Sequence, residues 1–300
     1  MEVQEAKTVQ LQAAEQVVGD LIRRARIAQS SFAQLGQQSL DDAVAAAGWA
    51  IMEPGRNRQL AELAVRETSL GNVDDKITKN HRKTLGLLRD LKGVRTHGVT
   101  LEDKSKGITE FTRPVGVVAA ITPSTNPGAT PANNIINALK CGNAVIVAPS
   151  PKGLGVSQML VDFIHAELRK CHLPVDLVQS LPSPISKALT AELMRQADLV
   201  VATGSQANVR MAYTCGTPAF GVGAGNVASI IDSSADAQQA ASLIIASKTF
   251  DNATSCSSEN SMVVLDAIRG DMLQAMSDRG ALLLTSDEKA RLQSVMWKNG

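Results

Sequence analysis

One cysteine of this 300-residue chain stands in an unusually polar segment. Residues 250–261 read Phe-Asp-Asn-Ala-Thr-Ser-Cys-Ser-Ser-Glu-Asn-Ser, with Cys256 near the middle. A thiol in such a segment is a poor core filler, and an ionised thiol attacks carbonyl carbons, so Cys256 is a candidate nucleophile. On these residues alone, a buried structural role is an equal alternative.

The other cysteines each end a predicted helix among apolar residues, and we expect them to be structural. They are Cys141, Cys171 and Cys215. The cysteine spacing fits neither a metal site nor a disulfide framework, so no metal is predicted and a reducing, cytoplasmic setting is expected. Nothing in the sequence pairs a histidine with Cys256 as a Cys–His protease would require. The histidines are His81, His97, His165 and His172.

Three loops rich in small and polar residues follow predicted strands. They are 122–128 (with Thr122, Pro123 and Asn126), 149–153 (with Pro149, Ser150 and Lys152) and 203–205 (Thr203, Gly204 and Ser205). Open α/β sheets bind ligands beyond the carboxyl ends of their strands. The third loop opens a helix, whose free N–H groups suit a pyrophosphate. The alternative is that each loop is an ordinary turn or cap.

A glycine-rich segment, 221–226, reads Gly-Val-Gly-Ala-Gly-Asn. It fails as a dinucleotide fingerprint, because its third glycine comes one residue early and a strand rather than a helix follows.

The elements that would position these residues fall into two regions. Residues 1–92 are typical of amphipathic helices, broken at Pro54 and Gly55, and 93–107 is turn-rich and compatible with a short hairpin. From residue 107 onward, strands and helices alternate, which is the signature of a doubly wound parallel sheet in an α/β protein. The predicted strands are 115–122, 144–148, 177–181, 199–202, 229–232 and 261–265. The predicted helices are 132–140, 154–170, 185–196, 206–214 and 235–249.

Composition narrows the class of protein. Hydrophobic residues make up 44% of the chain and charged residues 20%, the mix of a globular protein. The net charge is +1, which offers no electrostatic case for nucleic acid or a membrane surface. The start of the chain is polar, unlike a secretory signal, and the longest apolar run, 115–121, is too short to cross a bilayer.

Together, these segments resemble the aldehyde dehydrogenase superfamily. The resemblance rests on Asn126 after a buried strand, on 203–205, on 223–226 and on 248–252 leading to Cys256. The nearest branch is the coenzyme-A-acylating one, and within it the overall similarity is to enzymes of sulfoacetaldehyde. Family members are longer, so the chain resembles a fragment. The resemblance implies a helical region and NAD(P)-binding domain over 1–240 and the start of a second α/β catalytic domain over 241–300.

The resemblance also implies a mechanism. Cys256 would attack the aldehyde, and the oxyanion would be held by the Asn126 side-chain amide and a backbone N–H at Cys256. After hydride transfer to the nicotinamide, a thioester on Cys256 would remain. Hydrolytic members carry a glutamate base in the segment that aligns with 221–226, where this chain has no carboxylate. Water needs such a base and the thiol of coenzyme A does not, so thiolysis is expected. Glu259 is an alternative base, and a structural hydrogen bond is its simpler role.

For the dinucleotide, the resemblance implies contacts from the three loops and from Gly223. The ribose-binding lysine of hydrolytic members aligns with Ala148 and their acidic residue with Pro151. With no carboxylate in this loop, Lys152 would attract a 2′-phosphate and Ser150 would bond either cofactor, which favours NADP over NAD. Alternatively, Lys152 is a solvated surface charge.

The substrate's charge points to the basic segment 79–83. By resemblance this helix runs beside the substrate channel, and Arg82, or failing it Lys83, is predicted to hold a sulfonate. A solvated basic helix face is the alternative. Two other functions stay open, namely an acylating enzyme of acetaldehyde or another short aldehyde using NAD, and a non-catalytic fragment that binds nucleotide or self-associates. The full-length protein is expected to be a homo-oligomer.

Overall fold

The computed structural model describes residues 2–297, with side chains from Leu11 onward. The chain forms two compact units, residues 1–224 and 225–300. The domain boundary predicted near residue 240 lies inside helix α9 (Ala237–Thr249) and stays a prediction about functional domains.

The first unit is built on a five-stranded sheet with the order β5-β4-β3-β6-β7, in which all neighbouring strands are parallel. The strands are β3 (Val117–Thr122), β4 (Ala144–Pro149), β5 (Val178–Ser180), β6 (Leu199–Thr203) and β7 (Ala219–Val222). Every residue of β3 and β4 is buried, as expected for strands covered on both faces. The doubly wound fold is therefore confirmed, and the strand order reverses between β3 and β6.

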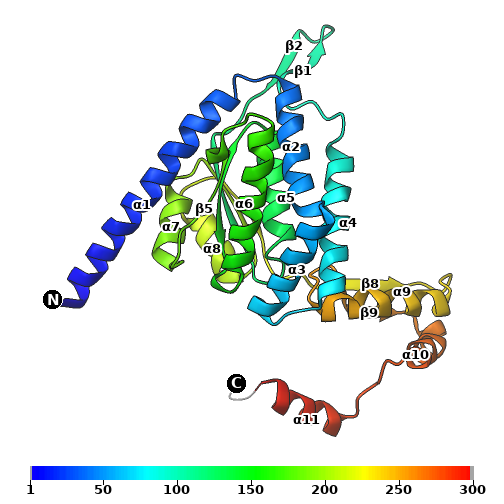
Figure 1. Ribbon diagram of the computed structural model, residues 1–300. Helices are drawn as coiled ribbons and strands as arrows, with labels where there is room; N and C mark the ends of the chain where they lie inside the picture. Colours follow the sequence, from blue (N-terminus) through cyan, green and yellow to red (C-terminus); the bar gives the residue numbers. More distant parts are fainter. Residues whose placement is uncertain (1, 298–300) are drawn as a thin grey trace. The chain divides into compact units, whose positions relative to one another are not determined.

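Helices cover both faces of this sheet (Figure 1). The crossovers α5 (Ala129–Lys140) and α6 (Leu154–Lys170) pack under an outer layer of α2 (Gln37–Met52), α3 (Pro54–Thr68) and α4 (Val73–Leu91). The long helix α1 (Glu2–Phe32) packs against α7 (Lys187–Gln196), while α8 (Gln206–Thr214) follows β6. Two single 3-10 turns, Pro151–Gly153 and Val175–Leu177, begin α6 and precede β5.

Local caps explain where the outer helices begin. Glu53 accepts hydrogen bonds from the backbone N–H groups of Gly55 and Arg56 ahead of α3, and Pro54 occupies its first turn. The N–H groups of Arg56 and Gly55 lower the pKa of the Glu53 carboxyl. Asn72 caps α4 by accepting from the Asp75 N–H at 2.9 Å. An antiparallel hairpin is present, as expected, with β1 (Gly98–Asp103) and the turn inside the turn-rich segment 93–107. Its second strand, β2 (Ile108–Thr112), lies just beyond that segment.

The second unit has a small core. Its strands β8 (Val227–Ile231) and β9 (Glu259–Val264) form a parallel pair of their own, rather than extending the first sheet. The other elements are α9, the 3-10 turns Phe250–Ala253 and Asp266–Ile268, α10 (Arg269–Asp278) and α11 (Ser286–Met296). The strand predicted at 229–232 is thus real but belongs to the second unit, and β7 is a sheet strand that the alternation did not reveal. None of the helices within residues 2–297 is long and apolar enough to cross a membrane.

Candidate active site and cofactor loops

The three predicted cofactor loops lie at the same edge of the first sheet and touch one another. The Ser150 N–H donates to the Thr122 carbonyl at 3.0 Å, and a Cβ on Gly153 would come within 2.7 Å of Pro127. A Cβ on Gly204 would lie 3.3 Å from the Pro123 side chain, and Gly204 has a φ of +135°. Loops after β3, β4 and β6 therefore form one continuous surface at the strand-order reversal, where such folds bind nucleotides.

Gly223 lies beside the same surface. The Gly204 N–H donates to the Val222 carbonyl at 3.0 Å, which joins the loop after β6 to the end of β7. A Cβ on Gly223 would come within 2.8 Å of the Gln206 amide at the start of α8. The predicted cofactor residues from four strand ends are thus brought together.

Two polar atoms at the end of β3 and in the loop that follows it are buried without a hydrogen-bond partner among the described residues. They are Oγ1 of Thr122, a residue only 3% exposed, and Oδ1 of Asn126. Buried polar atoms are nearly always paired in folded proteins. Their position at the carboxyl end of the central strand fits a loop that completes its hydrogen bonds with a bound molecule.

A buried asparagine pair supports that loop from outside. Asn80 on α4 is 6% exposed, and its Nδ2 donates to Asn57 Oδ1 on α3 at 3.0 Å. A Cβ on Gly128 would lie 3.4 Å from Asn80 Oδ1, so α4 packs directly on the end of the Asn126 loop. The sequence did not predict that these two asparagines support the loop. They lie on different helices, and their contact is visible only once α3 and α4 are packed together.

The two residues predicted to bind a sulfonate, Arg82 and Lys83, are exposed on α4. Lys76 and Lys79 of the same helix are buried instead. The sulfonate contact therefore stays a prediction, on a face that is open to solvent.

Charges of both signs flank the start of α6. Lys152 is exposed in the 3-10 turn after Ser150. Glu67, from the end of α3, accepts from the Val156 N–H at 3.3 Å, and a Cβ on Gly155 would lie 2.0 Å from its Oε1. The loop 149–153 contains no carboxylate of its own. The Glu67 carboxylate, which comes from a distant part of the chain, nevertheless lies close to the start of α6 just after this loop.

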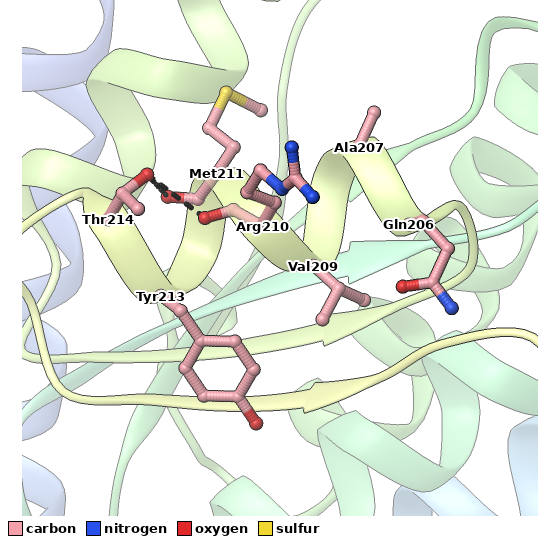
Figure 2. A pocket seen from close by; sticks show the side chains of 7 residues that line it. All are labelled: Gln206, Ala207, Val209, Arg210, Met211, Tyr213 and Thr214. Atoms are coloured by element: carbon pink, nitrogen blue, oxygen red, sulfur yellow. Dashed lines mark hydrogen bonds between the residues drawn. The ribbon is translucent and has the colours of Figure 1, made fainter.

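An open hollow of about 890 Å³ runs along α8 from Gln206, the residue after the loop 203–205. Figure 2 shows Val209 and Tyr213 on one side of the helix and Arg210 on the other. The Tyr213 hydroxyl accepts from the Gly221 N–H at 3.0 Å, which fixes the ring against β7. The hollow offers apolar and cationic contacts beside the predicted pyrophosphate seat.

Cys256 is exposed and follows an irregular turn in the second unit. Three consecutive residues, Asp251, Asn252 and Ala253, have positive φ angles of 52°, 52° and 61°. A second turn surrounds the cysteine, because the N–H and the Oγ of Ser258 both donate to the Ser255 carbonyl, at 3.2 and 2.9 Å. Runs of left-handed backbone in residues other than glycine are uncommon and gather at functional sites.

Glu259, the alternative base, is partly exposed at the start of β9. Its Oε2 atom is buried without a hydrogen-bond partner in the described part of the chain. It lines an opening of about 450 Å³ together with Lys248 and Arg279. The simpler structural hydrogen bond expected for this carboxylate is therefore not seen at Oε2.

The remaining cysteines end α5, α6 and α8, as predicted. Cys141 and Cys171 are nevertheless exposed, and only Cys215 packs on the core. Desolvation raises the pKa of the Cys141 thiol, while the Lys140 charge opposes it. Desolvation likewise raises the pKa of the Cys171 thiol, and the charges of Asp42 and Glu167 act in the same direction. Neither thiol is thereby activated as a nucleophile.

Among the side chains that the structure describes, those of residues 11–297, no group of three or more histidine, cysteine, aspartate or glutamate residues is arranged to hold a metal ion.

Both the sequence and the fold of this chain are similar to those of known proteins. The model of the aldehyde dehydrogenase family matches residues 2–292. A sulfoacetaldehyde dehydrogenase (acylating) from Cupriavidus necator is 69% identical over 288 residues, which cover 96% of this chain and 58% of that protein. The chain therefore spans little more than half the length of this relative.

Solved structures of aldehyde dehydrogenases have the same fold as this chain. The crystal structure of an acetylating aldehyde dehydrogenase from Geobacillus thermoglucosidasius superposes with a TM-score of 0.90 at 33% identity, over 96% of this chain and 64% of that one. A propionaldehyde dehydrogenase from Rhodopseudomonas palustris, with bound CoA and an acylated cysteine, superposes with a TM-score of 0.81 at 26% identity. That match covers 93% of this chain and 63% of that one.

Proposed function

Because this chain belongs to the aldehyde dehydrogenase family, we propose that it is part of an acylating enzyme that oxidises sulfoacetaldehyde onto coenzyme A. The observation that carries the proposal is the 69% identity to a sulfoacetaldehyde dehydrogenase (acylating). The chain spans 58% of that relative, so the activity proposed is that of the whole protein.

Cys256 is the proposed nucleophile. Its thiolate attacks the aldehyde carbon and forms a carbon–sulfur bond, and the carbonyl oxygen becomes an oxyanion. The Asn126 side-chain amide and the backbone N–H of Cys256 are the proposed donors to that oxyanion, and loss of one such donor typically lowers the rate by roughly 100- to 1,000-fold. When a nicotinamide dinucleotide is bound, it accepts the hydride. The product left on Cys256 is a thioester.

Thiolysis by coenzyme A then releases the acyl group and restores the Cys256 thiol. The segment 221–226 contains no carboxylate that could activate water. A thiol ionises far more readily than water and attacks the thioester without a base at this position. The acylated cysteine and bound CoA named for the Rhodopseudomonas palustris enzyme support this order of events.

The dinucleotide is proposed to bind across the joined loops at the carboxyl end of the first sheet. The residues that would hold it are Thr122, Pro123, Pro149, Ser150, Lys152, Thr203, Gly204, Ser205 and Gly223. The unpartnered Thr122 Oγ1 supports a ligand there. The exposed ammonium of Lys152 favours the 2′-phosphate of NADP over the hydroxyl of NAD.

A second candidate is an acylating dehydrogenase of acetaldehyde or another short uncharged aldehyde. It is supported by the 33% identity to an acetylating aldehyde dehydrogenase and by the exposed setting of Arg82 and Lys83. We further propose that the whole protein is a homo-oligomer. A reducing, cytoplasmic setting is also proposed, and the four free cysteines support it.

The test is a panel of sulfoacetaldehyde, acetaldehyde and propionaldehyde, each with and without coenzyme A and with either dinucleotide, followed as dinucleotide reduction. Sulfoacetaldehyde should give the highest kcat/KM, and multiple turnovers should require coenzyme A. Cys256→Ser should abolish oxidation while dinucleotide binding persists. Rapid release of free acid without coenzyme A would overturn the thiolysis step, and turnover by the serine variant would remove Cys256 from the mechanism.

A further inference from the structure

The backbone of the Gly225 segment lies directly against Cys256 within the second unit. A Cβ built on Gly225 would stand 2.4 Å from the Cys256 carbonyl oxygen and 3.4 Å from the Cys256 Cβ. Real Cβ atoms do not come that close to an oxygen, so no other residue fits at Gly225 without moving the cysteine. The position of the thiol therefore depends on where the Gly225 backbone is held.

The Asn260 side chain is hydrogen-bonded to that backbone. Asn260 Nδ2 donates a hydrogen bond to the Gly225 carbonyl at 3.3 Å. Lys248 Nζ, from the last turn of α9, donates to Asn260 Oδ1 at 2.9 Å. Because the Oδ1 atom accepts from lysine, the amide group of Asn260 is oriented with its Nδ2 donor toward Gly225.

An irregularity in the pairing of β8 with β9 explains why the Asn260 side chain can reach the Gly225 carbonyl. Val227 pairs with Glu259, and the next residue, Ala228, pairs with Ser261, so Asn260 is the extra residue of a bulge in β9. A bulge removes a residue from the ladder and re-aims its side chain, and bulges are frequent beside active sites. This one stands four residues after Cys256 and turns the Asn260 side chain toward the start of β8.

We propose that Asn260 is a positioning residue for Cys256, which clamps Gly225 against the cysteine backbone, and that Lys248 orients the Asn260 amide. The inference rests on the proposed role of Cys256 as nucleophile. It assigns a role to two further side chains, Asn260 and Lys248. Both would act through the backbone around Cys256 and not by contact with the thiol or the aldehyde. Small misplacements of a nucleophile lower turnover more than substrate binding, because attack requires close alignment.

The test separates the two hydrogen bonds of Asn260. Asn260→Ala removes both, whereas Asn260→Asp keeps an acceptor for Lys248 but cannot donate to the Gly225 carbonyl. Both variants should lower kcat for CoA-dependent aldehyde oxidation about tenfold, with KM changed less than about twofold. Lys248→Met should lower kcat by a smaller factor, on the order of threefold. Ser261→Ala, at the next position of β9, is the matched control and should match the unchanged protein.

Amide hydrogen exchange, read by mass spectrometry, gives a second readout that does not need turnover. Exchange in peptides covering 225–227 and 255–258 should quicken in both Asn260 variants, while exchange in β3 and β4 stays the same. An Asn260→Asp variant with unchanged kcat and exchange would overturn the clamp on Gly225. An unchanged Lys248→Met variant would remove Lys248 from it. If the unchanged protein oxidises no aldehyde, the proposed function fails, and the exchange comparison still decides whether the clamp exists.

Discussion

Two glycines set much of the geometry of the candidate site at the level of single residues. Gly204 combines a φ of +135° with a Cβ position 3.3 Å from Pro123, so a side chain there would strain the backbone and press on the loop after β3. Gly225 leaves no room for a Cβ beside the Cys256 carbonyl. In both cases an absent side chain lets a backbone segment approach a residue that is proposed to act on the cofactor or the substrate.

Arg82 provides a residue-scale test of substrate charge. Arg82→Ala should raise KM for sulfoacetaldehyde about tenfold and leave acetaldehyde turnover nearly unchanged, because a guanidinium meets two sulfonate oxygens at once and has no counterpart in acetaldehyde. Steady-state kinetics with both substrates measure the effect. Arg89→Ala, an exposed arginine in the last turn of the same helix, is the control. Equal losses for both aldehydes, or none for either, would place the sulfonate contact elsewhere.

Lys152 provides the corresponding test for the cofactor. Lys152→Glu should weaken NADP binding about tenfold and NAD binding less than about threefold, since a carboxylate repels the 2′-phosphate that the ammonium attracts. Titration calorimetry with each dinucleotide gives both dissociation constants. Lys104→Glu, in the exposed turn between β1 and β2, makes the same charge change outside the cofactor loops. Matching losses for the two cofactors would leave Lys152 without a selective role.

At the level of elements, the parts that depend on local sequence were predictable and the parts that depend on distant partners were not. The apolar runs that became β3, β4 and β6 and the helices between them lie within a few residues of their predicted bounds. The pairing of β8 with β9, and the bulge at Asn260 that it contains, require the register of two strands separated by α9. The approach of Glu67 to α6 is likewise a contact between remote segments.

The left-handed turn ahead of Cys256 allows a test at this scale. Ala253 has a φ of 61°, a conformation in which an L side chain crowds its own backbone at a cost of roughly 1 kcal/mol. Glycine avoids this crowding but loses more backbone freedom on folding, so Ala253→Gly should stabilise the second unit modestly, by up to about 1 kcal/mol. Chemical denaturation followed by hydrogen exchange in 225–296 measures the change.

The control for that substitution has the opposite expected sign. Ala246→Gly lies on the exposed side of α9, where the backbone is right-handed, and should destabilise the same unit by about 1 kcal/mol. If both glycine variants destabilise, another contact of Ala253 outweighs its backbone crowding.

At the level of the whole molecule, the two units have very different cores. The first has a continuous core that extends from α1 and α2 through all the central strands. Among its described residues, 225–297, the second has five buried apolar side chains: Ile231, Ala241, Ile244, Met272 and Ala275. Apolar side chains on its strands remain open, with Ile230 79% exposed. Most of the burial that stabilises the chain therefore belongs to the first unit.

This difference in core size predicts which of the two units folds when it is produced as a separate fragment. A fragment of residues 1–224 should unfold cooperatively and bind the dinucleotide within about threefold of the affinity of the whole chain, because all the joined cofactor loops lie inside it. A fragment of residues 225–300 should show no cooperative transition, since chains of this size with few buried side chains are marginal. Calorimetry and dinucleotide titration of each fragment provide the measurements. A folded 1–224 fragment that binds neither dinucleotide would contradict the assignment of the cofactor loops, since every residue proposed to hold the cofactor would be present and correctly placed.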